Sequence, residues 1–256
     1  VLTGADAGNY TLTTNATTVA DIYKVVLNLD GTRVYDGGTV ASAGMFGTAG
    51  VIAGVAGENL ILSGQGVLGS KNVATDRPLA ALGSLALNND GAGLASNYTL
   101  MGGNHIATVT PLGINAGITA DDKVYDGNTG AVTHGVLSGV LGGDQVSLST
   151  NGAFVDKNAA NGKTVNVDGS ISGGDASNYV LSFNPTTVAS ITKRPVVVDA
   201  QGTDKFFDGN TADRATLSSS GILPGDVIAF GAASALFGNS SIGLGKAVSV
   251  SGIYAT

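Results

Sequence analysis

The sequence predicts an all-β protein built from tandem antiparallel β-sandwiches. Glycine occupies 40 of 256 positions and only 12% of the residues are charged, with Glu58 as the single glutamate. Helix surfaces are usually covered by Glu, Lys and Arg, so this composition argues against helices. An apolar fraction of 43% also argues against disorder. The third observation is that several motifs recur along the chain, which is typical of a repeat protein.

Short segments alternate between apolar and polar residues, as in strands with one buried face. Val146 and Leu148 are separated and flanked by polar residues, and the same holds for Val165 and Val167. Turn residues separate such segments and recur roughly every 8 to 12 residues. This pattern predicts several short strands in each repeat.

Charge and cysteine content exclude several classes of function. The net charge is −7, so the chain would repel phosphate backbones and we expect no nucleic-acid partner. The absence of cysteine excludes disulfides, zinc–thiolate sites and cysteine nucleophiles. The uncharged stretch 39–57 is long enough to cross a membrane, but it is rich in glycine. We therefore expect strands and turns there, and no membrane insertion.

Three motifs recur about 80 to 90 residues apart. The aromatic-Asp-Gly motif occurs at Val34–Thr39, Val124–Thr129 and Phe206–Thr211. The Asn-Tyr motif occurs at Asp6–Leu12, Leu94–Leu100 and Asp175–Leu181. The third, the Gly-Asp motif, occurs at Gly143-Asp144 and Gly225-Asp226, with Gly57-Glu58 as its relative.

The phase of these motifs predicts the domain boundaries. Residues 23–110 form repeat 1, 111–192 form repeat 2 and 193–256 form repeat 3, which is truncated. Residues 1–22 are expected to be the C-terminal end of a preceding repeat. β-Branched segments join the repeats without a flexible spacer, so we expect an elongated rod.

The aromatic-Asp-Gly motif predicts a turn. Asp36, Asp126 and Asp208 each precede a glycine, as in a turn where the carboxylate accepts a local backbone N–H and glycine takes a positive φ. The preceding ring is Tyr35, Tyr125 or Phe207. Because phenylalanine replaces tyrosine once, we interpret the hydroxyl as optional and the ring as a core anchor.

The Asn-Tyr motif has the spacing of the tyrosine corner of immunoglobulin-like sandwiches, in which a tyrosine hydroxyl bonds back to the backbone. Tyr10, Tyr98 and Tyr179 are never replaced by phenylalanine, so we expect their hydroxyls to be used. The fold class is thus predicted to be immunoglobulin-like.

The motif Lys123–Thr129 and its copies resemble the YDG and related MBG-type repeats of very large bacterial exoproteins, often filamentous-haemagglutinin-like adhesins exported by two-partner secretion. The resemblance covers nearly the whole chain. It implies a β-rich stalk that is extracellular and attached to the outer bacterial surface, with a role in cell adhesion and biofilms. It implies no known ligand, and it marks only Tyr35, Tyr125 and Phe207 with their Asp-Gly partners as structural positions.

No motif predicts catalysis or cofactor binding. Gly64–Gly69 spells GxGxxG, but no helical pattern follows it. Gly162-Lys163-Thr164 is half of a phosphate-binding loop, and a hairpin turn is the simpler interpretation. His105 and His134 lack catalytic or metal-binding neighbours and are expected to be exposed or at a sheet edge. We expect no enzyme, no catalytic, cofactor-binding or metal residues, and an unknown ligand site.

Aspartates near the repeat boundaries leave calcium as the alternative to a chain without cofactors. Asp121 and Asp122 lie near one boundary, and Asp199 and Asp204 lie near the next. Calcium needs six or more oxygen ligands, and these aspartates are only loosely aligned between repeats.

The leading hypothesis is a structural stalk or spacer segment of a cell-surface adhesin that presents a distal binding region. The alternative is a module that binds a host or matrix glycan or protein through repeated weak sites on loops at the sandwich ends. Self-association is a further expectation, since residues 1–22 of one molecule carry the Asn-Tyr motif that 193–256 of a neighbour lack.

Overall fold

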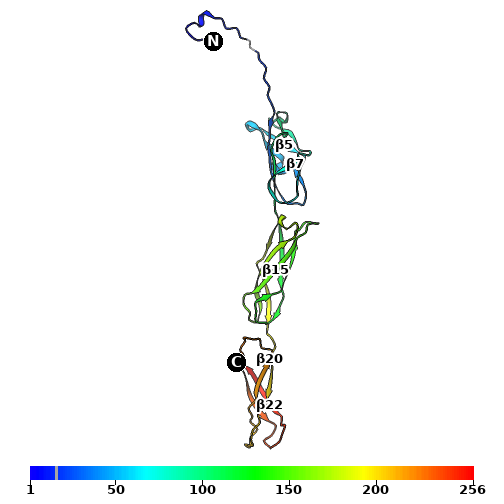
Figure 1. Ribbon diagram of the computed structural model, residues 1–256, viewed down its shortest axis with the longest axis vertical. Coiled ribbons are helices and arrows are strands. Elements are labelled where there is room, and N and C mark those ends of the chain that lie inside the picture. Colours follow the sequence, from blue (N-terminus) through cyan, green and yellow to red (C-terminus); the bar gives the residue numbers. More distant parts are fainter. Residues whose placement is uncertain (15–16) are drawn as a thin grey trace. The chain divides into compact units, whose positions relative to one another are not determined.

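The computed structural model describes residues 1–14 and 17–256, and strands dominate them (Figure 1). The only helical elements of the described residues are 3-10 turns of three residues each: η1 (Ala7–Asn9), η2 (Ala43–Met45), η3 (Thr48–Gly50), η4 (Val55–Gly57), η5 (Ala95–Asn97) and η6 (Ala176–Asn178). The predicted all-β class is confirmed. Within the described ranges, no helix has the length and apolar character needed to cross a bilayer.

The chain divides into two compact units, which are described separately. The first unit consists of Val1–Gly113 together with two short segments of repeat 2, Leu141–Gln145 and Gly174–Val180. The second unit contains Ile114–Val140, Val146–Gly173 and Leu181–Thr256. In Figure 1, β5 and β7 belong to the first unit, whereas β15, β20 and β22 belong to the second.

Three sheets build the first unit. The largest has the order β2-β10-β7-β6-β3, with β2 (Leu29–Val34), β10 (His105–Thr110), β7 (Ala74–Ala81), β6 (Gln65–Leu68) and β3 (Val40–Ser42). The second has the order β4-β5-β8, with β4 (Val51–Ala53), β5 (Asn59–Ser63) and β8 (Ala86–Asp90). A short pair joins β1 (Val25–Val26) and β9 (Tyr98–Thr99). The uncharged stretch 39–57 therefore forms strands and turns, as predicted.

The core of the first unit comes from alternating strand positions. Leu29 on β2, Leu60 and Leu62 on β5, and Ala107 and Val109 on β10 are all buried. Burial of each leucine contributes about 1.5–3 kcal/mol, which is the main driving force available to a repeat without disulfides.

Four sheets build the second unit. The five-stranded sheet has the order β12-β18-β16-β15-β13, with β12 (Lys123–Val124), β18 (Thr186–Thr192), β16 (Ala160–Ser172), β15 (Ser147–Phe154) and β13 (Gly130–Ala131). The three-stranded sheet has the order β14-β11-β17, with β14 (Thr133–Ser138), β11 (Leu112–Ala120) and β17 (Tyr179–Phe183). Repeat 3 supplies two pairs, β19 (Val197–Gln201) with β20 (Thr216–Ser220), and β21 (Phe230–Phe237) with β22 (Val248–Ala255).

The predicted alternation is confirmed in β16, where Val165 and Val167 are buried with Phe154, Ala189 and Ile191. Val146 and Leu148 are half-buried. Gly162 is not in a hairpin turn, however. It lies within β16, where the pairing with β18 shifts register between Ala160 and Lys163.

Three of the described ladders are parallel, although the sequence predicts antiparallel sheets. They are β1–β9, β2–β10 and β12–β18. Parallel strands need a long crossover connection, and here nearly the whole repeat supplies it, because β2 and β12 lie near the start of a repeat and β10 and β18 lie at its end.

Residues 1–22 contribute no strand in the part that the structure describes, 1–14 and 17–22. The side chain of Tyr10 is exposed, at 72% of its accessible surface. The expectation that this segment ends a preceding repeat stays a prediction.

Candidate functional site

The aromatic-Asp-Gly turn is held by local bonds around one lysine. In repeat 2, Oδ1 of Asp126 accepts the N–H of Asn128 at 3.1 Å, and Gly127 has a φ of +81°. Lys123 Nζ donates to Asp126 at 2.8 Å and to the carbonyl of Gly130 at 2.9 Å. The bond from Lys123 is the largest cause that lowers the pKa of Asp126, and the bond from the Asn128 N–H is the next. The predicted turn is confirmed, and its charge is neutralised locally.

Repeats 3 and 1 build the same turn. Lys205 Nζ donates to Asp208 at 2.8 Å, and Asp208 accepts the N–H of Asn210 at 3.0 Å. In repeat 1, Arg33 takes the place of the lysine and forms an ion pair with Asp36. The carboxylate of the turn is therefore paired with a cation three residues before it in all three repeats.

In the first unit, this turn places Tyr35 against a carboxylate of repeat 2. The backbone N–H of Tyr35 donates to the carbonyl of Thr110 at 2.8 Å, and the side chain is only 1% exposed. Its hydroxyl donates to Oδ2 of Asp144 at 2.6 Å. Asp144 follows Gly143, whose φ of +95° turns the Gly-Asp motif toward the tyrosine.

A second tyrosine shares this carboxylate. The hydroxyl of Tyr179 donates to Oδ2 of Asp144 at 2.6 Å and accepts the N–H of Leu141 at 3.1 Å. The rings of Tyr35 and Tyr179 meet edge to face, with centroids 5.5 Å apart. Such aromatic pairs contribute about 0.5–1.5 kcal/mol beyond their burial.

Lys71 of repeat 1 supplies the positive charge. Its Nζ lies 2.6 Å from Oδ1 of Asp144 and 3.0 Å from Oδ1 of Asp175. It also lies 5.8 Å from the centroid of the Tyr35 ring, within the range of a cation–π interaction. We call Tyr35, Lys71, Asp144, Asp175 and Tyr179 the junction network.

An asparagine extends this network into the core. Asn178 is 1% exposed, and its Oδ1 accepts the N–H of Val73 at 2.9 Å. Its Nδ2 donates to Oδ1 of Asn72 at 3.2 Å. A buried amide is costly unless it is hydrogen-bonded, so these bonds hold Asn178 to one position.

Electrostatics define the protonation states at neutral pH. Lys71, and then Tyr179 and Tyr35, lower the pKa of Asp144 from 3.8 to about 2. Burial, and then the bond to Asp144, raise the pKa of both Tyr35 and Tyr179. The carboxylate is therefore ionised, and both phenols are neutral donors.

The second unit repeats part of this arrangement between residues of repeats 2 and 3. The hydroxyl of Tyr125 donates to Oδ1 of Asp226 at 3.0 Å. Lys157 Nζ lies 3.6 Å from Asp226 and 5.9 Å from the Tyr125 ring centroid. Tyr125 and then Asp226 raise the pKa of Lys157. The tyrosine, lysine and carboxylate thus recur as a set.

Repeats 1 and 3 show which positions of the set vary. In repeat 1, the hydroxyl of Tyr98 donates to Oε2 of Glu58 at 2.6 Å and accepts the N–H of Val55 at 3.0 Å, as Tyr179 does with Asp144 and Leu141. In repeat 3, the positions of Tyr35, Lys71 and Asn72 are occupied by Phe207, Ser240 and Ser241.

These contacts correct one interpretation and confirm another. The hydroxyl of the aromatic-Asp-Gly motif is not optional in repeats 1 and 2, because Tyr35 and Tyr125 both use it. Phe207 is 67% exposed and does not act as a core anchor. The hydroxyls of Tyr98 and Tyr179 are used as predicted, but they accept backbone N–H groups about 40 residues upstream rather than a few residues upstream.

Sequence reasoning missed Lys71 and Asn72, and it noted Asn178 only as part of the Asn-Tyr motif, without its bonds. A signal was present, because Lys71-Asn72 recurs as Lys157-Asn158 at the matching point of repeat 2. Backbone bonds establish the match, because the N–H of Leu68 donates to the carbonyl of Thr39 as the N–H of Phe154 donates to that of Thr129. Each lysine lies three residues after the donor of its bond.

The two histidines occupy different settings. His105 is half-buried, with Nδ1 accepting the N–H of Leu29 at 3.2 Å and Nε2 lying 2.7 Å from the carbonyl of Leu100. His134 is exposed and lies 2.9 Å from Asp121. Gly64 and Gly69 flank β6, and the next element of the described chain is the strand β7 rather than a helix.

The boundary aspartates do not gather at one point. Asp121 pairs with His134, Asp122 accepts the N–H of Ser190, Asp199 lies on β19, and Asp204 precedes Lys205. Among the residues placed by the structure, no three His, Cys, Asp or Glu side chains form a group that could hold a metal ion.

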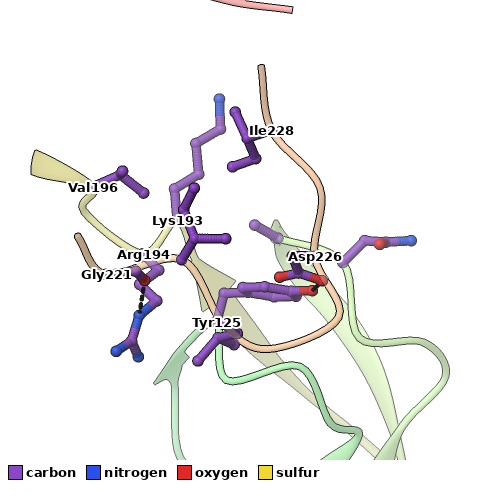
Figure 2. A pocket seen from close by; sticks show the side chains of 11 residues that line it. Tyr125, Lys193, Arg194, Val196, Gly221, Asp226 and Ile228 are labelled. Atoms are coloured by element: carbon purple, nitrogen blue, oxygen red, sulfur yellow. Dashed lines mark hydrogen bonds between the residues drawn. The ribbon is translucent and has the colours of Figure 1, made fainter. Parts of the chain in front are cut away.

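A cavity of about 300 Å³ lies beside Tyr125 in the second unit (Figure 2). Tyr125 and Asp226 lie on one side of it in the close-up, and Arg194 donates to the carbonyl of Gly221 at 2.8 Å. Residues of both repeat 2 and repeat 3 line the cavity, including Asn158 and Ile228.

Comparison with known proteins identifies the repeated unit. A family model described as the YDG domain matches the chain three times, over residues 24–108, 107–188 and 192–256. No curated protein and no solved structure matches the chain.

Proposed function

The chain belongs to the YDG domain family, and we propose that it is a spacer segment of a large bacterial surface adhesin. In this role, consecutive repeats hold a distal binding region away from the cell. The observation that carries the proposal is the junction network, in which Tyr35 and Lys71 of repeat 1 bond to Asp144 of repeat 2. Contacts of this kind couple neighbouring repeats, which a spacer needs in order to resist bending.

Small-angle scattering of the 256-residue chain tests the proposal. A compact protein of this length has a radius of gyration of about 18 Å, so a spacer should give a clearly larger value. The double variant D144N/D226N should broaden the range of dimensions while the circular dichroism of the strands is unchanged. A radius of gyration near the compact value would contradict the spacer role.

The proposed location is the outer surface of the bacterium. Antibodies raised against residues 24–256 should label intact cells, and brief treatment with an external protease should remove the label. Labelling only after permeabilisation would contradict an extracellular site.

A second proposal is a module that binds a glycan or a protein through loops at the ends of the repeats. The cavity beside Tyr125 favours it, because its volume of about 300 Å³ lies at the lower end of the range for ligand pockets. A glycan array probed with the whole chain tests this proposal, with Y125A as the matched variant. Binding that Y125A abolishes would support it.

A further inference from the structure

A strand near the start of repeat 1 and the strand at its end form one parallel ladder. β2 pairs with β10 over six residue pairs, from Leu29 with His105 to Val34 with Thr110. The backbone N–H of Tyr35 donates to the carbonyl of Thr110 at 2.8 Å and extends the ladder by one bond. The two ends of the repeat are therefore joined to each other directly.

The parallel direction of the strands decides how tension along the chain acts on this ladder. The chain enters β2 at Leu29 and leaves β10 at Thr110, which lie at opposite ends of the ladder. Tension along the chain therefore pulls the two strands past each other. Hydrogen bonds in a parallel ladder are evenly spaced, so in this shear geometry they carry the force together. A force across the strands would instead load the bonds one at a time.

Side chains strengthen the ladder of repeat 1. Leu29 on β2 and Ala107 on β10 are both 2% exposed, so one face of the ladder is shielded from water. The N–H of Leu29 donates to Nδ1 of His105 at 3.2 Å. At the other end, the hydroxyl of Thr110 donates to the carbonyl of Arg33 at 3.3 Å. The two strands are thus held against sliding by side chains as well as by backbone bonds.

Repeat 2 contains the same ladder in a shorter form. β12 pairs with β18 in parallel over two residue pairs, the last of which joins Val124 to Thr192. The N–H of Tyr125 donates to the carbonyl of Thr192 at 2.9 Å and closes the ladder, as Tyr35 does in repeat 1. The two ladders therefore end at equivalent points and differ in where they begin.

An aspartate interrupts the ladder of repeat 2. Asp122 lies three residues before the closing tyrosine, as Thr32 does in repeat 1, where Thr32 pairs with Thr108. Asp122 lies outside the strands and accepts the N–H of Ser190 with its side chain instead. Before it, β11 pairs with β14 of the other sheet as far as Ala120. Most of the first strand of repeat 2 thus belongs to the other sheet, and little of it pairs with β18.

We propose that these parallel ladders are mechanical clamps of unequal strength, and that repeat 2 unfolds before repeat 1 when the chain is under tension. Forced unfolding is governed by the rate of the unfolding step, and in repeat 1 this step breaks the long ladder as a whole. Repeat 2 has a short ladder and yields at a lower force, which adds length while repeat 1 stays folded. The biological meaning rests on the proposed spacer function, because a spacer between a cell and a bound partner carries tension.

Single-molecule force spectroscopy on the whole chain tests the proposal. The chain has no cysteine, so pairs of introduced cysteines determine where DNA handles pull. The K24C/G113C variant loads the ladder of repeat 1 in shear, and the G113C/K193C variant loads that of repeat 2; all three positions are exposed. At the same loading rate, the mean unfolding force should be higher for the first pair than for the second. Equal forces, or a higher force for repeat 2, would overturn the proposal.

The T39C/G113C variant is the matched control for the direction of the force. Thr39 and Gly113 both follow the end of the ladder at which β2 and β10 finish, so handles there pull across the strands. This variant should unfold at a lower force than K24C/G113C, with circular dichroism as the check that all three variants keep their strands. Equal forces in the two directions would overturn the clamp. A compact radius of gyration would contradict the spacer role alone and leave the difference in force unchanged.

Discussion

The hydroxyl of Tyr35 lies 2.6 Å from Oδ2 of Asp144, 109 positions further along the chain. The tyrosine belongs to the aromatic-Asp-Gly motif of repeat 1, and the aspartate belongs to the Gly-Asp motif of repeat 2. These two motifs recur in step because together they form one contact between consecutive repeats, which Tyr125 and Asp226 form again.

Replacing Tyr35 with phenylalanine should destabilise the chain without changing its fold. The substitution removes a bond to a charged acceptor, and such bonds contribute about 1.5–3 kcal/mol. Urea unfolding followed by circular dichroism should show the loss. Y10F is the matched control, because Tyr10 is exposed. Equal midpoints for the two variants would show that the buried hydroxyl contributes nothing.

Acid should weaken the junction network in a defined pH range. A carboxyl whose pKa is lower in the folded than in the unfolded chain stabilises fully above the unfolded value, and this stability is lost as the pH falls through the folded value. For Asp144 the range runs from about pH 4 down to about pH 2. The stability difference between wild type and D144N should therefore shrink across this range. Thermal unfolding at several pH values measures it, with D6N as the control, and a constant difference would refute the assignment.

Removal of the Lys71 ammonium should raise the pKa of Asp144. Lys71 is the largest cause of the lowered value, so K71M should move the pKa from about 2 toward 3.8. Carboxyl carbon shifts measured by NMR through an acid titration would report the change. K24M should leave the Asp144 titration unchanged, and a shift of equal size in both variants would speak against the contact.

Glycine is required in the aromatic-Asp-Gly turn because of its backbone conformation. Gly209 has a φ of +79°, and a Cβ there would meet no atom within 4 Å, so only the conformation opposes a side chain. G209A should cost about 1–2 kcal/mol. G113A is the control, since Gly113 has open space and no positive φ. An equal loss of stability in the two variants, measured by calorimetry, would exclude conformational strain at Gly209.

His105 should matter for stability, in contrast to His134. H105A removes the acceptor of the Leu29 N–H, and an unsatisfied buried donor costs about 1–3 kcal/mol. The carbonyl of Leu100 loses His105 but keeps the N–H of Gly103. H134A removes only an exposed contact with Asp121. Hydrogen exchange at Leu29 should become faster in H105A alone; unchanged exchange would argue against the bond.

The parts of the fold that follow from local pattern could be predicted from the sequence. The alternation of Val165 and Val167 identified a buried face, and Asp126-Gly127 identified the turn. The parallel ladders could not be predicted, since the strands that pair belong to opposite ends of a repeat. Strand pairing over that separation depends on topology rather than on periodicity.

The junction network was missed for a related reason. Comparison of equivalent positions suggested that the Tyr35 hydroxyl was optional, because Phe207 lacks it. In repeat 3, however, Ser240 and Ser241 also replace the lysine and the asparagine, so the whole set changes together. A contact between different motifs of different repeats becomes visible only when their spatial proximity is known.

A repeat with a tyrosine like Tyr35 and a carboxylate like Asp144 supplies one group to each of its two junctions. The tyrosine bonds to the repeat that follows, and the carboxylate bonds to the repeat that precedes. Duplication or deletion of one whole unit therefore recreates the same bonds at the new seam, with no compensating substitution needed. We therefore expect that the length of the protein can change in steps of one unit while the contact between neighbouring repeats is kept. A unit with the Phe207, Ser240 and Ser241 set is the exception, and its position in the array constrains which units can follow it.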